Sequence, residues 1–136
     1  MSRLAVDAVH IDQLREHGGL PGIRDENVLE SALARARNKW AYEETSDLAA
    51  LAAAYGYGIT TSHPYRDGNK RIAFLAMMIF LGLNGHSLSS PESEVVSTMF
   101  AVADGRLSEE ELAAWLRGYI VGRYADDRRD SGGETV

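Results

Sequence analysis

The sequence contains no cysteine, which excludes disulfide bonds and thiolate metal sites. Its histidines stand at positions 10, 17, 63 and 86, and this spacing fits no metal-binding motif. Prolines number only three, and neither proline nor glycine gathers into a linker. The 136 residues therefore fit one domain, and a hydrophobic fraction of 45% is enough for its core.

Positive charge is also scarce, with 14 lysine and arginine residues against 20 acidic residues and a formal net charge of −6. This balance argues against direct nucleic-acid binding, which usually needs a broad basic face. The most apolar run, residues 72–83, is 12 residues long, too short to span a bilayer core of about 30 Å. The first residues lack the charged start and apolar core of a signal peptide. We therefore expect a cytoplasmic protein that contacts neither nucleic acid nor membrane.

Helical periodicity accounts for most of the chain and predicts an all-α, compact, single-domain bundle of about six helices. The fourth helix is hydrophobic nearly all round, so we expect it at the centre. Gly56 and Gly58 weaken the third helix but allow close contact with a neighbouring helix. The end of the chain is charged, then small and polar, which predicts a folded domain at 1–124 and a disordered tail at 125–136. The expected helices cover residues 4–17, 25–39, 47–62, 68–83, 91–105 and 108–120.

The most informative stretch is residues 63–71, His-Pro-Tyr-Arg-Asp-Gly-Asn-Lys-Arg, which stands between the third and fourth helices. Pro64 disfavours the helical conformation for His63, so the third helix should end there. Asp67 is placed to cap the fourth helix, with its carboxylate accepting a hydrogen bond from a backbone N–H two or three residues on. Polar side chains are thus concentrated where the most apolar run of the chain begins.

The start of the fourth helix is a natural phosphate site, because its free N–H groups and its dipole favour negative charge. Gly68 and Asn69 leave room for a ligand to approach the backbone. His63, just upstream, is suited to take a proton from a hydroxyl that attacks a bound phosphate. The alternative is an ordinary capped helix with solvated cations and a structural histidine. The nearby cations are Arg66, Lys70 and Arg71.

Residues 63–71 resemble the signature of Fic-fold proteins, His-x-Phe-x-Asp/Glu-Gly-Asn-x-Arg, with Tyr65 at the phenylalanine position. The ending Asn-Lys-Arg is similar to the death-on-curing (Doc) branch, the toxins of bacterial toxin–antitoxin pairs. The resemblance covers about residues 4–124 and implies the Fic/Doc fold. Other stretches also look like that branch, at residues 18–25, 30–32, 41–44 and 47–48.

The resemblance implies a role for each residue of the signature. His63 would be the catalytic base, Asp67 would hold Mg²⁺, and Lys70 would complete the catalytic set. Tyr65 would be a packing residue that fixes the loop and not a catalyst. The phosphates of ATP would be bound by Gly68, Asn69, Lys70 and Arg71.

Two departures from the wider family indicate which group is transferred. Fic proteins that transfer AMP carry Gly-Asn-Gly-Arg and a second arginine three residues later, whereas this chain has Lys70 for the second glycine and Phe74 for that arginine. The Doc branch, which has this lysine, is associated with phosphorylation of a target hydroxyl. We therefore predict a toxin that transfers the γ-phosphate of ATP to a Ser or Thr hydroxyl of a protein. The alternatives are a Fic-type AMP-transferase and a catalytically silent module that binds a partner.

The resemblance also implies partners. The target would be elongation factor Tu, and translation would stop. An antitoxin would contribute a flexible segment that folds on binding, as a helix in a groove of the toxin. Residues 39–46, in which Trp40 and Tyr42 lie between charges, would form a flap that positions a target segment beside the active site. The alternative for this stretch is a loop whose aromatic side chains pack on the body.

Overall fold

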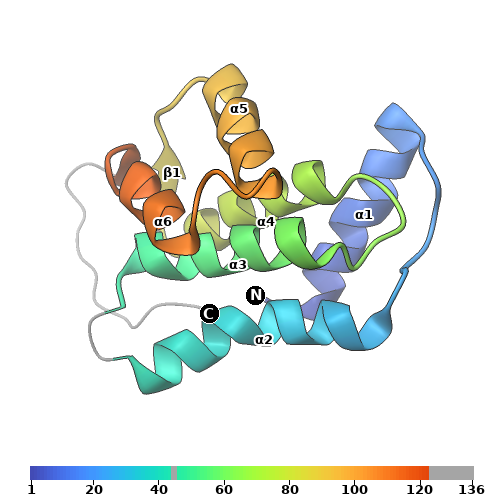
Figure 1. The fold of residues 1–136 in the computed structure, drawn as a ribbon, viewed down its shortest axis with the longest axis horizontal. Helices are drawn as coiled ribbons and strands as arrows, with labels where there is room; N and C mark the ends of the chain where they lie inside the picture. Colours follow the sequence, from blue (N-terminus) through green and yellow to red (C-terminus); the bar gives the residue numbers. More distant parts are fainter. Residues whose placement is uncertain (44–45, 123–136) are drawn as a thin grey trace.

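The computed structural model describes residues 1–43 and 46–122. Two three-residue strands, β1 (His86–Leu88) and β2 (Ile120–Gly122), pair antiparallel. The all-α prediction is confirmed for this part of the chain, whereas the tail predicted at 125–136 lies outside the described residues. Six helices make up the described body (Figure 1): α1 (Arg3–His17), α2 (Glu26–Tyr42), α3 (Leu48–Ser62), α4 (Asn69–Leu83), α5 (Glu92–Ala103) and α6 (Glu109–Arg117).

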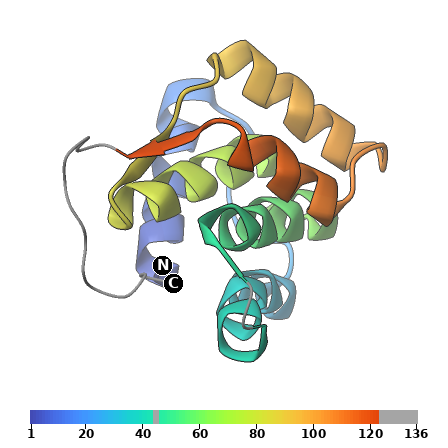
Figure 2. The same cartoon turned by 90° about the vertical axis from the view of Figure 1, so that its left-hand side faces the viewer.

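Helix α3 is the most enclosed element of the bundle. It packs against α2, α4, α5 and α6, and Figure 2 shows it nearly end-on, with α2 on one side and α4 and α6 on the other. Ten of its fifteen residues are buried, against seven of fifteen in α4. The central place predicted for α4 is therefore shared with α3. One face of α4 is only half-buried, and Phe74 and Leu75 lie on it.

Glycines explain how closely the neighbours approach α3. A Cβ added at Gly56 would overlap the side chain of Met77 on α4. One added at Gly58 would lie 3.3 Å from Cδ of Arg35 and 3.4 Å from the carbonyl oxygen of Ala32, both on α2. The close contacts predicted for these two glycines are confirmed.

Helix α2 runs on to Tyr42, beyond its expected end near residue 39. An ion pair between Lys39 Nζ and Glu43 Oε1, at 3.2 Å, spans this last turn. Trp40 and Tyr42 therefore lie on a helix, and they are 45% and 83% exposed. The alternative interpretation of residues 39–46, a loop whose aromatic side chains pack on the body, is therefore wrong for Trp40 and Tyr42. The flap suggested for 39–46 falls partly outside the described residues and stays a prediction.

Helix α6 is shorter than predicted. It begins with a capping box, in which Ser108 Oγ accepts a hydrogen bond from Glu111 N at 3.1 Å and Glu111 Oε1 accepts one from Ser108 N at 2.9 Å. It ends at Arg117, and Ile120, expected on the same helix, pairs with Leu88 in the two-stranded sheet. The spacing of apolar residues continues past the end of α6 because Ile120, on β2, also packs against the hydrophobic core.

Candidate active site

The loop between α3 and α4, residues 63–68, begins at His63, which ends α3 in a left-handed conformation (φ 52°, ψ 59°). Pro64 disfavours the right-handed helical region for the residue before it, as the sequence predicts. Among the described residues His63 is the only non-glycine residue with a positive φ, a conformation that costs about 1–2 kcal/mol. Contacts around the 63–68 loop must offset that cost, while His63 itself is exposed to solvent.

The segment between α1 and α2 supplies these contacts. The backbone N–H groups of Arg24 and Asp25 both donate to the carbonyl oxygen of Pro64, at 2.7 and 3.2 Å. In the other direction, Arg66 N donates to the carbonyl oxygen of Gly22 at 3.1 Å. Two segments far apart in the sequence are thereby joined like a short pair of strands.

The side chain of Arg24 completes this attachment. Its Nε donates to the carbonyl oxygen of His63 at 2.6 Å, and its Nη2 donates to that of Ser62 at 2.8 Å. A guanidinium at this position satisfies carbonyl groups that the end of α3 leaves unpaired and suits the negative end of the helix dipole. Residues 18–25, matched by the resemblance outside the signature, therefore contain the support of the 63–68 loop.

Tyr65 and Asn69 fix the interior of the loop. Tyr65 N donates to Asn69 Oδ1 at 3.0 Å, and Asn69 Nδ2 donates to the carbonyl oxygen of Tyr65 at 2.9 Å. Both side chains are buried, which confirms the packing role of Tyr65. Both polar atoms of the Asn69 amide therefore hold the loop, and Nδ2 keeps a second N–H beside the backbone N–H of Asn69.

His10 of α1 lies beneath this pair. Its ring centroid is 4.4 Å from that of Tyr65, and its Nε2 accepts a hydrogen bond from Gly22 N at 3.2 Å. Burial lowers the pKa of His10 below its ordinary value, which favours the neutral imidazole that this hydrogen bond requires. His10 thus connects α1 both to the 63–68 loop and to the segment that supports it.

Asp67 does not cap α4, contrary to the prediction. The capping position belongs to Gly68 in a left-handed conformation (φ 75°), and no side chain caps the helix. Asp67 Oδ1 accepts from Gly68 N at 2.9 Å, and Oδ2 accepts from Leu20 N at 3.2 Å. Only glycine fits at position 19 beside it, since a Cβ there would lie 2.8 Å from Asp67 Oδ2. The N–H groups of the first turn of α4 are consequently left for a ligand.

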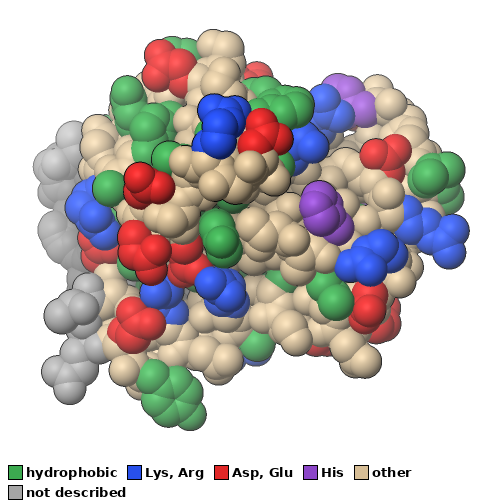
Figure 3. Space-filling view, in the orientation of Figure 1, with side chains coloured by type: hydrophobic (Ala, Val, Ile, Leu, Met, Phe, Trp, Pro, Cys, Tyr) green, Lys and Arg blue, Asp and Glu red, His purple; other side chains and the backbone are tan. Residues whose placement is uncertain are grey.

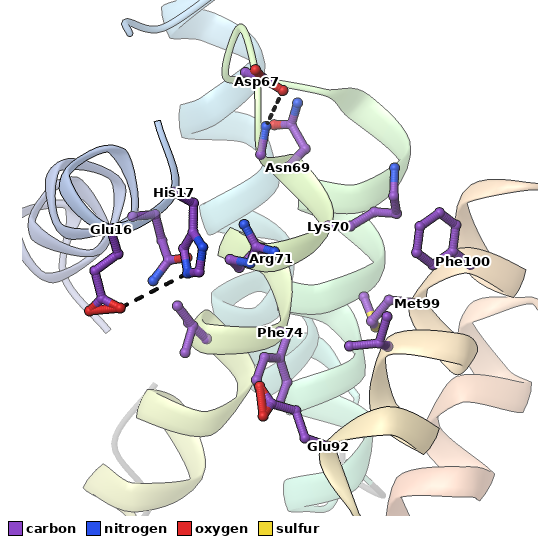
Figure 4. Close-up of a pocket in the computed structure, with 14 residues that line it drawn as sticks. Glu16, His17, Asp67, Asn69, Lys70, Arg71, Phe74, Glu92, Met99 and Phe100 are labelled. Carbon is purple, nitrogen blue, oxygen red and sulfur yellow. Dashed lines mark hydrogen bonds and ion pairs between the residues drawn. The ribbon is translucent and has the colours of Figure 1, made fainter. Parts of the chain in front are cut away.

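A pocket of about 500 Å³ opens in front of this helix terminus, between α1, α4 and α5 (Figure 4). Its volume is within the range of small-molecule sites. One end is polar and is formed by the start of α4, and the other end is mainly apolar. The polar end consists of Asp67, Gly68, Asn69, Lys70 and Arg71, and the apolar side chains are Phe74, Leu75, Val96, Met99 and Phe100.

Two cations at the polar end lack an acidic partner. Lys70 Nζ lies 4.9 Å from the ring centroid of Phe100, and neither Lys70 nor Arg71 forms an ion pair with a carboxylate of the described residues. Together with the free N–H groups and the helix dipole, they make this end of the pocket a strong anion site. Phosphate is the ligand that such a combination suits best.

The pocket brings together five of the six residues that the sequence predicts for the site, and it leaves out His63. His63 lies outside the pocket wall, exposed where the 63–68 loop begins. The roles of these residues stay predictions. No group of three or more metal-ligating side chains occurs in the described residues, so a metal would depend on Asp67 together with ligand oxygens and water, as Mg²⁺ often does.

Sequence reasoning missed the walls contributed by α1 and α5. Gln13, Glu16 and His17 line the pocket from the end of α1, and His17 Nε2 lies 3.9 Å from Glu16 Oε2. Met99 and Phe100 line it from α5. His17 precedes the glycine pair that ends α1, which gave a weak signal, whereas nothing in the sequence of α5 distinguishes a pocket wall from an ordinary apolar face.

The molecular surface adds two observations. Acidic and basic side chains are interspersed over the face shown in Figure 3, without a broad basic area on that face. In the described part of the chain, no helix combines the length and the apolar character needed to cross a bilayer.

Comparison with known proteins gives two matches. The family model described as Fic/DOC family matches residues 2–81, which include α1 to α4 up to Leu81 and the whole 63–68 loop. The chain is also 33% identical over 111 residues to "Protein kinase doc" of Escherichia phage P1, an alignment that covers 81% of this chain and 86% of that protein.

Proposed function

This chain belongs to the Fic/DOC family, and from that premise we propose that it is a Doc-like toxin kinase. In this proposal it transfers the γ-phosphate of ATP to a Ser or Thr hydroxyl of a protein. The relative in phage P1 carries the name of a protein kinase, and the polar end of the pocket suits the phosphates of a nucleotide.

The observation that carries the proposal is the polar end of the pocket. Free backbone N–H groups at the start of α4, together with Lys70 and Arg71, converge on one end of a cavity of about 500 Å³. Phosphoryl transfer consists mostly of positioning and charge stabilisation, since the transferred group spreads negative charge over its oxygens. Two cations without acidic partners supply that stabilisation without first breaking an ion pair.

Phe74 and Lys70 favour phosphate transfer over AMP transfer. Phe74 lines the pocket where AMP-transferring relatives would offer an arginine, so that part of the wall presents no cation to a phosphate. Lys70 adds its charge at the opposite, polar end. The charged groups that hold phosphates are therefore concentrated where the terminal phosphate would be transferred.

The position of His63 fits an in-line reaction. The attacking and leaving oxygens lie on opposite sides of the phosphorus atom in such a reaction. With the nucleotide in the pocket, the target hydroxyl would approach from outside, where His63 is exposed and would take its proton. His63 acts as the general base in this scheme.

Asp67 would hold the metal. It is exposed at the rim of the pocket, and each of its oxygens accepts one hydrogen bond, which leaves lone pairs for a cation. Mg²⁺, when bound, would neutralise charge on the phosphate oxygens. Gly68, Asn69, Lys70 and Arg71 would contact those oxygens.

The partners in this proposal come from the family resemblance. The target protein would be elongation factor Tu, and an antitoxin with a segment that folds on binding would restrain the toxin. Residues 39–46 would be the flap that positions the target. The exposed side chains of Trp40 and Tyr42 are available for such a contact.

The proposal is tested with ATP labelled at the γ or the α position, Mg²⁺ and purified elongation factor Tu. Label from the γ position should enter the target, and His63→Ala should reduce the rate at least 100-fold, about the lower limit of general base catalysis. His86→Ala is the matched control, because His86 lies on β1 and does not line the pocket.

The alternatives give different results. Label that arrives only from the α position would make the protein an AMP-transferase. If expression arrests growth, and that arrest persists in the His63→Ala variant, the protein acts by binding a partner.

A further inference from the structure

Phe100 is the aromatic residue that faces the signature from another helix. Its ring is 48% exposed on α5, and the ammonium of Lys70 lies 4.9 Å from the ring centroid. In Figure 4 the Lys70 side chain lies beside the ring of Phe100, which projects from α5. Lys70 forms no ion pair with a carboxylate of the described residues, and the ring of Phe100 is the charge contact that the structure gives its ammonium.

The contact solves a problem that a lysine creates at a phosphate site. A lysine side chain has four rotatable bonds, and it loses conformational entropy when it is fixed. Phe100 itself is well placed to hold it, because Met99 beside it and Val102 two residues on are both buried and anchor α5. An aromatic face attracts one side of an ammonium and leaves N–H groups on the other side free for phosphate.

We propose that Phe100 is a positioning residue for Lys70, which holds the ammonium ready for the terminal phosphate of the nucleotide. Phe100 would act through Lys70 and not through contact with the nucleotide base. The proposal rests on the proposed function for the identity of the ligand, a nucleotide. The effect of Phe100 on phosphate binding by Lys70 does not depend on which reaction follows.

The test is a double-mutant cycle on binding, measured by calorimetry with ATP and, separately, with inorganic tripolyphosphate in the presence of Mg²⁺. Phe100→Ala should weaken both ligands about two- to fivefold, the range of a partly exposed cation–π contact. In the Lys70→Ala background the same substitution should have no further effect. Phe100→Leu, which keeps an apolar side chain without an aromatic face, should behave like Phe100→Ala, and Phe100→Trp should restore binding.

Each contrary result has a definite meaning. If Phe100→Ala weakens ATP and leaves tripolyphosphate unchanged, Phe100 contacts the base and the proposal is wrong. If Phe100→Ala tightens binding, the contact restrains Lys70 instead of presenting it, and the proposal is also wrong. A loss that persists without Lys70 excludes it as well. Calorimetry can show this pattern of phosphate binding even if no γ-label is transferred to a protein. The binding test and the label-transfer test can therefore fail independently of each other.

Discussion

Two pairs of cations in this protein have opposite surroundings. Arg35 and Lys39 of α2 converge on Glu109 of α6: both Nε and Nη2 of Arg35 donate to Glu109 Oε1, and Lys39 Nζ lies 3.6 Å from Oε2. Glu109 is only 8% exposed. Lys70 and Arg71 of α4, by contrast, form no ion pair with a described carboxylate, although Glu16, Asp67 and Glu92 line the same pocket.

The difference indicates what each pair is for. A buried carboxylate with two cations is already satisfied, and it joins the ends of two helices. Cations left without a carboxylate beside a bare helix terminus are held ready for an anion that the protein does not itself supply. The sequence predicts a phosphate-binding role for Lys70 and Arg71 from the signature, whereas the carboxylate that Arg35 and Lys39 share becomes visible only in the fold.

Loss of one cation from the binding pair should have the largest effect. Lys70→Ala should reduce kcat for phosphate transfer about 10²–10³-fold, as loss of one stabilising donor does, which corresponds to about 2.7–4 kcal/mol. The thermal midpoint of unfolding should stay unchanged because the ammonium forms no ion pair. Arg106→Ala, which removes an exposed cation that does not line the pocket, is the control for loss of charge. Unchanged turnover in Lys70→Ala would remove Lys70 from the site.

Removal of the acidic partner from the structural pair should give the converse result. Glu109→Gln should lower the free energy of unfolding by about 1–3 kcal/mol, because two cations lose a buried charged acceptor. ATP binding should stay unchanged. The matched control is Glu110→Gln, one residue along the same first turn and exposed, which should change stability by less than about 0.5 kcal/mol. Urea denaturation measures both, and equal losses in the two variants would contradict the structural role of Glu109.

The smallest effect should come from a change of pH. It acts on His10, which contacts Tyr65 of the 63–68 loop and Gly22 of the segment that supports this loop. Burial lowers the pKa of His10 below its ordinary value of 6.5, with Asp7 opposing the shift. The unfolded chain then binds the proton more readily, so the stability contributed by neutral His10 is complete above pH 6.5 and declines as the pH falls toward the folded pKa.

A comparison of the wild type with His10→Gln isolates this contribution. The wild-type midpoint of thermal unfolding should fall more between pH 7 and pH 5 than that of His10→Gln, because the two proteins differ at no other residue. Parallel curves would show that His10 makes no such contribution.

The sequence predicted much of this architecture because its signals are local. Pro64 ended α3 at His63, and the capping box placed the start of α6. The signature brought five predicted residues to one pocket, because they are consecutive and share one loop and one helix start.

What could not be predicted depends on contacts between distant segments. Asp67 accepts from Leu20 instead of capping its own helix, and the side chain of Asn69 bonds the backbone of Tyr65. Phe100 reads as an ordinary apolar position of α5 until the fold places it opposite Lys70. The position of His63 outside the pocket likewise follows from how the loop is held.

The attachment of the 63–68 loop to residues 22–25 has a consequence for how this protein tolerates change. Exposed connections between helices usually accept insertions and deletions. Here Ile23 and Tyr65 are paired in register, and one residue added or removed before Arg24 would pull its guanidinium away from His63. A length variant in that outwardly ordinary connection should therefore disable the enzyme as thoroughly as a substitution within the signature, although every signature residue remains intact.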